Sequence, residues 1–241
     1  MANTKKNQVE IDFEKCADIF GDLIYPEENN LDGLMCKIHD AFGSNKSKHH
    51  NCLGCNLDRS THQIFMFLYR KDKHDDLELS ATTYLLLMYL VIERLETIFE
   101  IIGLPDAYRD KHFHIFKMIN KWANFIKHPK AFVLCHHPTF VTENDKKIIE
   151  LKRQSKIIID TQFVFKYYST DNNKKELFKE LANKSDVLVL YPDFKQITKD
   201  FCDGLIKFVR LIENNEVYRE ILSDKTTIQD YFTEELENSE K

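Results

Sequence analysis

The segment from Ser80 to Ile102 constrains the fold more than any other part of this sequence. It is apolar almost all round from Tyr84 to Ile92, and Gly103 and Pro105 follow at the positions where helices stop. A helix without a polar face in its first half must be covered by other elements, so it is predicted to be the central helix of a bundle. In its second half a polar face opens, formed by Glu93, Arg94, Glu96 and Glu100.

Apolar residues at helical spacing predict helices on both sides of this segment. They are expected at Val9–Ile24, from a cap at Asp58 or Ser60 to about Arg70, at Arg109–Lys127, at Phe194–Asn214, and after a cap at Thr226. Between Phe132 and Tyr191, by contrast, segments rich in β-branched and aromatic residues alternate with polar loops. The predicted fold class is mainly α: a helical bundle with a small inserted β element in the C-terminal half.

The predicted organisation has three parts. Residues 1–130 form a helical body that includes a Cys/His loop (36–55) and a motif helix (109–128). Residues 131–192 form a small α/β insertion, and residues 193–241 form C-terminal helices that pack on the body.

The composition predicts a globular protein, with 43% hydrophobic and 30% charged residues. The N-terminal sequence MANTKKNQVEID has no apolar core of a secretory signal. The longest apolar run, Tyr84–Ile92, is shorter than the roughly 20 residues that a membrane span requires. We therefore expect a cytoplasmic protein that does not interact with membranes.

The net charge of −5 is unevenly distributed. Residues 109–130 carry six Lys or Arg against one Asp, a local charge of +5, whereas residues 213–241 carry nine acids against three bases, a local charge of −6. This split either steers a polyanion to one face or pairs two surfaces of one fold.

The segment from Arg109 to His128 is amphipathic at helical spacing. Its apolar side consists of Ile115, Phe116, Ile119, Trp122, Ala123 and Ile126. The polar side, within an arc of roughly 80°, consists of His114, Lys117, Lys121, Asn124 and His128. Such a face is either simply solvated, with His128 interacting with the helix dipole just before Pro129, or a cationic, imidazole-bearing functional surface.

The sequence KWANFIKHPKAF, residues 121–132, resembles the signature region of the HEPN superfamily. These helical domains are common in RNases of toxin–antitoxin, CRISPR and other anti-phage systems. Members typically carry an Arg, a polar residue, and a His four to six residues after the Arg, near the end of one bundle helix. Two members usually dimerise, so that the motifs face each other and form one metal-independent RNase site. The resemblance covers about 50 residues, from Ser80 to Phe132.

The resemblance implies that His128 is the catalytic His and Asn124 its polar companion. No Arg lies four to six residues before His128; Lys121, seven residues before it, supplies charge without a guanidinium group. Arg109 and His114 satisfy the family spacing and form an alternative register.

The implied function is that of a metal-independent endoribonuclease of a bacterial toxin or anti-phage defence system. It would act on RNA as a homodimer, with an antitoxin or sensor protein as a further partner. The alternative is a catalytically inactive HEPN-like module that binds RNA, nucleotide or protein and is held together by structural zinc. The missing Arg favours this alternative.

Four residues suggest the zinc site: Cys36, His39, Cys52 and Cys55, with the spacing C-x2-H-x12-C-x2-C. Both short spacings suit tetrahedral zinc, and three sulfurs with one imidazole would close a structural site. The polar loop between the two pairs is too poor in apolar residues to fold around a core, so a metal would be useful there.

Alternatively, Cys36 lies on an apolar helix face, and the remaining CxxC is a pair of inert thiols. A redox role is disfavoured because no strand precedes Cys52. Cys16 and Cys202 occupy apolar helical positions and are expected in the core.

Overall fold

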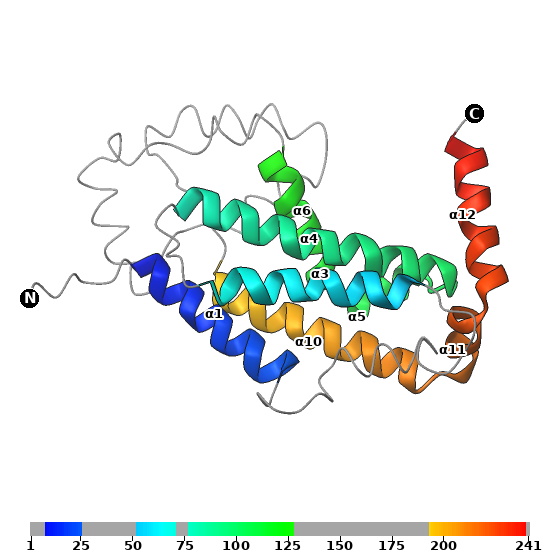
Figure 1. The fold of residues 1–241 in the computed structure, drawn as a ribbon, viewed down its shortest axis with the longest axis horizontal. Coiled ribbons are helices and arrows are strands. Elements are labelled where there is room, and N and C mark those ends of the chain that lie inside the picture. The colour runs from blue at the N-terminus through cyan, green and yellow to red at the C-terminus, as the bar shows by residue number, and fades with distance from the viewer. Residues whose placement is uncertain (1–7, 26–51, 71–76, 128–192, 240–241) are drawn as a thin grey trace, which may run out of the picture.

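The computed structural model describes residues 8–25, 52–70, 77–127 and 193–239. Every regular element in these ranges is a helix (Figure 1). The helices are α1 (Gln8–Ile24), α3 (Cys52–Leu68), α4 (Leu77–Ile101), α5 (Asp106–His112), α6 (His114–Lys127), α10 (Phe194–Glu213), α11 (Glu216–Ser223) and α12 (Lys225–Ser239). The prediction of a mainly α protein is confirmed for this part of the chain. The predicted β element falls within residues 131–192, which lie outside the described residues.

Five of the helices enclose one core. α1 packs against α10 and α3, α3 against α4, α4 against α6, and α6 against α10, so the contacts close into a ring. The prediction that α4 is central is wrong in its position, since α4 is one of the five helices of the ring, although most of its apolar side chains are buried. α4 is also not covered on every side, because Leu79 and Leu90 are exposed. None of the described helices combines the length and hydropathy that a membrane crossing needs.

Aromatic rings fill both ends of this core. At one end Phe13, Phe67, Tyr84 and Phe194 bring together α1, α3, α4 and α10, with ring centroids 5.3 to 6.0 Å apart. At the other end Phe99, Phe113, Phe116, Phe201 and Phe208 bring together α4, α6 and α10, with centroids 4.9 to 6.0 Å apart. All nine side chains are buried, so the polar faces of the helices are held in place by a rigid, apolar interior.

Two glycines lie where a larger residue would be unfavourable, one because of its backbone conformation and the other because of a close neighbour. Gly103 ends α4 with φ 63°, and the N–H of Leu104 donates to the Phe99 carbonyl at 2.8 Å, as expected for a glycine stop signal. Gly204 on α10 lets α6 approach closely, because a Cβ there would lie only 2.8 Å from Cε1 of Phe116. α6 is therefore seated directly on the α10 backbone.

The motif helix predicted from Arg109 to Lys127 is in fact two helices. The break is at Phe113, whose φ of −125° and ψ of 31° are not helical. Its ring is buried, 4.9 Å from the Phe99 ring and 5.5 Å from the Phe116 ring. α5 itself buries no residue, so the interruption serves to place the Phe113 ring in the core while α5 turns toward solvent.

The predicted start of the second helix is also wrong, since α3 begins at Cys52. Its apolar face extends back to Leu57, which is buried, and Leu53, which packs against the core. The hydroxyls of Ser60 and Thr61 donate to carbonyls inside the same helix, at 2.6 and 3.0 Å. Neither Asp58 nor Ser60 therefore acts as a cap.

The C-terminal helices differ from the prediction in their caps. α10 is confirmed, and its predicted apolar face is buried. α11 was not predicted; Asn215 caps it by accepting a hydrogen bond from the Tyr218 N–H at 3.1 Å. Asp224, rather than Thr226, caps α12, because its carboxylate accepts from the N–H groups of Thr226 and Thr227 at 3.0 and 3.3 Å.

Candidate functional site

The polar face of α6, defined by His114, Lys117, Lys121 and Asn124, is the candidate site. On the opposite side of the helix Phe116, Ile119, Trp122 and Ala123 are buried, which confirms the predicted core face. On the polar face His114 and Lys117 are exposed, and Lys121 and Asn124 are half-buried. The structure thus brings four of the five predicted polar residues to one surface. His128 follows the last residue of α6 and lies outside the described residues.

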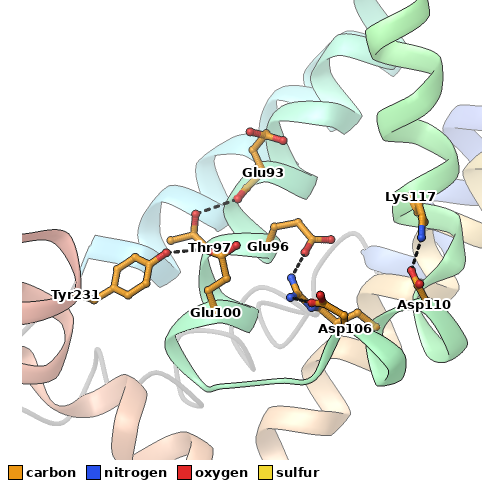
Figure 2. Close-up of polar contacts among 9 residues, drawn as sticks. Glu93, Glu96, Thr97, Glu100, Asp106, Asp110, Lys117 and Tyr231 are labelled. Atoms are coloured by element: carbon orange, nitrogen blue, oxygen red, sulfur yellow. Dashed lines mark hydrogen bonds and ion pairs between the residues drawn. The ribbon is translucent and has the colours of Figure 1, made fainter. Parts of the chain in front are cut away.

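Positive charge is crowded along this face. Partial burial lowers the pKa of Lys121, and the neighbouring Lys117 lowers it further. Lys117 Nζ also donates to Asp110 Oδ1 of α5 at 2.7 Å, an ion pair between two half-exposed side chains that Figure 2 displays. An anion bound here would relieve the repulsion between the two lysines, so the face is suited to a phosphate-bearing ligand.

Asn124 is held by its own helix. Its Nδ2 donates to Oδ1 of Asn120, one turn earlier, at 2.7 Å. This contact fixes the amide on the polar face, where it can donate or accept one further hydrogen bond.

Arg109 is engaged elsewhere. Its guanidinium donates to Glu96 Oε2 on α4 at 2.7 Å and also pairs with Asp106 within α5, contacts drawn in Figure 2. The Arg109 side chain is only 21% exposed. Arg109 lies on α5, whereas His114 lies on α6. Because of its two ion pairs, the Arg109 guanidinium holds α5 on α4 and does not lie open for a ligand.

The polar edge of α4 continues toward the end of the bundle. The Tyr231 hydroxyl of α12 donates to Glu100 Oε2 at 2.5 Å (Figure 2). Sequence reasoning singled out Glu96 and Glu100 only as part of a polar face, and it missed Tyr231 as the partner of Glu100 and Asp110 as the partner of Lys117. No spacing signal could have found these contacts, because the partners lie on different helices.

The end of α6 is fixed on α4. Nζ of Lys127 lies 3.2 Å from the centroid of the Tyr89 ring, a cation–π contact. The position from which the chain continues to His128 is therefore determined by the bundle.

The proposed zinc ligands are only partly described. Positions 52 and 55 lie in the first turn of α3, and the Cys55 thiol is half-buried and not in a disulfide. Cys36 and His39 lie outside the described residues. Among the residues that the structure describes, no group of three or more His, Cys, Asp or Glu is placed to hold a metal ion, but the set that the sequence suggests is not covered by that search. Cys16 and Cys202 are fully buried, which confirms their assignment to the core.

Comparison with known proteins assigns the chain to no family. No protein-family model matches the chain, and no curated protein or solved structure is significantly similar to it.

Proposed function

We propose that this protein is a HEPN-like, metal-independent endoribonuclease of a bacterial toxin or anti-phage defence system. The observation that carries the proposal is the polar face of α6, a row of cationic and amide side chains on a helix whose other side is locked in the core. A helix held in this way keeps its side chains in fixed positions, which catalysis requires. Lysines on such a face attract the RNA backbone.

These residue types can support cleavage of RNA. The 2′-hydroxyl of the substrate attacks the adjacent phosphorus, and the bond to the 5′-oxygen breaks, leaving a 2′,3′-cyclic phosphate and a 5′-hydroxyl. His128 would transfer a proton at one of these oxygens, since imidazole titrates near neutral pH. Lys121 and Lys117 would stabilise the charge that develops on the phosphorane, and Asn124 would orient the phosphate. The proposed zinc at Cys36, His39, Cys52 and Cys55 would be structural and take no part in this reaction.

The ion pairs of Arg109 favour His128 over the alternative register. A guanidinium that is paired with Glu96 and Asp106 on a side chain only 21% exposed is poorly accessible to a phosphate. We therefore assign Arg109 a structural role and place His114 at the margin of the RNA surface.

The decisive experiment is RNA cleavage by the purified protein and its His128→Ala variant. Loss of a proton-transfer group is expected to lower the rate by about 10²- to 10⁴-fold without changing the helical content. His62→Ala is the matched control, because His62 is exposed on α3. A chelator should not inhibit turnover directly. If Arg109→Ala with His114→Ala abolishes cleavage while His128→Ala does not, the assignment is wrong.

A second candidate is an inactive HEPN-like module that binds RNA, nucleotide or a protein. The pairing of Arg109 with two carboxylates favours this inactive module, because the polar face of α6 then receives no guanidinium from position 109. This module would bind RNA without cleaving it, and Lys117→Gln with Lys121→Gln would weaken binding to every RNA sequence and reduce its salt dependence. Wild-type toxicity of the His128→Ala variant in cells would favour this reading over the enzyme.

A further inference from the structure

Tyr108 and His112 form an exposed stacked pair on α5. Their ring centroids are 4.2 Å apart, and the angle between the ring planes is 29°. Tyr108 is 38% exposed, His112 is exposed as well, and α5 as a whole buries no residue. The packing of the core therefore does not explain why two aromatic rings stack at this place.

The pair is held on a fixed base. The buried Phe113 ring lies 6.4 Å from the Tyr108 ring and supports it from the core. Arg109 joins α5 to α4, and Asp110 joins it to α6, through the ion pairs that Figure 2 shows. A ring that is already fixed in position loses little conformational freedom when a planar ligand stacks on it.

A cation lies on the same side of α5 as the two rings. At helical spacing Tyr108, Lys111 and His112 fall within an arc of roughly 100°, and Arg109 and Asp110 lie outside this arc. Lys111 is exposed like its two neighbours. Aromatic rings beside a cation are the combination with which proteins bind single-stranded nucleic acid, because bases stack on the rings and the cation attracts the backbone.

The local charge distinguishes Tyr108 from the other exposed rings. Among the described residues, two further Tyr or Phe side chains are exposed to a similar extent, Tyr69 at 44% and Phe232 at 40%. The Tyr69 hydroxyl donates to a carbonyl of α1 at 2.6 Å, so this side chain fastens α3 to α1. Phe232 lies within residues 213–241, which carry a local charge of −6, whereas Tyr108 directly precedes residues 109–130, which carry +5. A polyanion is therefore attracted to Tyr108 and repelled from Phe232.

We infer that the Tyr108–His112 pair is a stacking site for an unpaired nucleobase of an RNA strand, with Lys111 as a contact to its phosphate. The choice of RNA as the ligand rests on the proposed function. The base is held on α5, whereas the phosphodiester to be cleaved lies on α6. A base inside a duplex is stacked on its neighbours and does not reach the rings, so the site selects single strands.

The test measures how tightly the full-length protein binds a short single-stranded RNA that contains 2-aminopurine. Methylated 2′-oxygens protect this RNA from the proposed cleavage, and the fluorescence of 2-aminopurine is quenched when the base stacks on a ring. Tyr108→Ala and His112→Ala are each expected to weaken binding by about 5- to 150-fold and to remove the quenching. Tyr108→Phe keeps the ring and should behave like the wild type. Lys111→Gln should weaken binding to every sequence and reduce its salt dependence.

Three controls define the ligand. Phe232→Ala removes a ring of similar exposure on α12 and should leave binding unchanged. The same RNA annealed to its complement should bind more weakly, and equally to the wild type and to Tyr108→Ala. Adenosine monophosphate distinguishes a strand from a free nucleotide. If it binds as tightly as the RNA, the ligand is a nucleotide and the inference is wrong.

Equal RNA binding by Tyr108→Ala and the wild type, or a wild type that does not bind the single strand, would overturn the inference. Cleavage of unmodified RNA separates it from the proposed function. If cleavage depends on His128 but Tyr108→Ala changes neither binding nor KM, the enzyme stands without the stacking site. If Tyr108→Ala weakens binding and the protein cleaves no RNA, the stacking site stands and the enzyme does not.

Discussion

A buried hydroxyl pair, Tyr84 and Thr198, joins α4 to α10 at one end of the core. Thr198 Oγ1 donates to the Phe194 carbonyl at 2.6 Å, which uses its one proton. The Tyr84 hydroxyl must therefore be the donor in its 2.7 Å contact with Thr198 Oγ1. Burial raises the pKa of Tyr84 well above its ordinary value, so the phenol keeps the proton that it donates.

This direction of donation predicts unequal effects of two substitutions. Thr198→Val leaves the Tyr84 hydroxyl buried without its acceptor and is expected to lower the free energy of unfolding by about 1–3 kcal/mol. Tyr84→Phe leaves no group unsatisfied, because Thr198 keeps its bond to Phe194, and should cost about 0.5–1.5 kcal/mol. Urea unfolding measures both, and a larger loss for Tyr84→Phe would show that the donor is Thr198.

Gly204 gives a second prediction for a single residue. Ala ordinarily stabilises a helix by about 1 kcal/mol relative to Gly. At position 204 the added Cβ would lie 2.8 Å from Phe116 Cε1, and that ring is fully buried between α6 and α10. We expect Gly204→Ala to destabilise the protein by about 1–3 kcal/mol in urea unfolding, since a packed ring has to move. The exposed Lys207→Ala on the same helix should change stability by less than about 0.5 kcal/mol.

Among the elements, α5 is held by ion pairs with its neighbours α4 and α6. It buries no residue of its own, and Arg109 connects it to Glu96 of α4. Arg109→Ala is expected to accelerate hydrogen exchange across α5, and Glu96→Gln should do so to a smaller extent because it keeps an oxygen acceptor.

Exchange in α1 and α10 should remain as in wild type, which serves as the internal control. A loss of RNA cleavage in Arg109→Ala with undisturbed exchange in α5 would instead indicate a direct role of Arg109 in catalysis.

Sequence periodicity predicted the helices whose ends and buried faces follow from local signals in the sequence. The stop of α4 at Gly103 and the buried face of α10 are examples, because the stop signal and the apolar spacing are local. The break at Phe113 could not be predicted, since it depends on a place for the ring between Phe99 and Phe116. The cap of α12 was misassigned to Thr226 because Asp224 and Thr226 are both good capping residues. Which of them caps the helix depends on the residue at which the helical backbone begins.

The candidate site was predictable to a similar extent. The polar face of α6 follows from spacing within one helix, and the structure brings its members together. The engagement of Arg109 with Glu96 does not follow from spacing, because the two residues lie on different helices whose packing the sequence does not encode locally. For the same reason no pattern linked Lys117 to Asp110 across the break.

For the whole molecule, metal content is the clearest test of the sequence-based zinc site. We expect about one zinc per chain in protein purified without chelator, bound by Cys36, His39, Cys52 and Cys55. Chelation should lower the melting temperature, because binding energy at a structural site contributes to folding. Cys55→Ser should reduce both metal content and melting temperature, whereas Cys16→Ser, at a buried position outside the set, should affect stability alone. Elemental analysis without zinc would contradict the prediction.

The anchoring of Lys127 and Phe194 has a consequence for how this chain can change in evolution. Lys127 rests on Tyr89 and the Phe194 ring packs 6.0 Å from that of Tyr84, so the described segments before and after residues 128–192 both contact α4. Tyr84 and Tyr89 are separated by roughly 7.5 Å along the axis of α4. Closing a connection between two fixed points costs only about 0.6 kcal/mol more for each doubling of its length. The length of the connection between these two points can therefore vary among natural variants at little cost in loop-closure entropy.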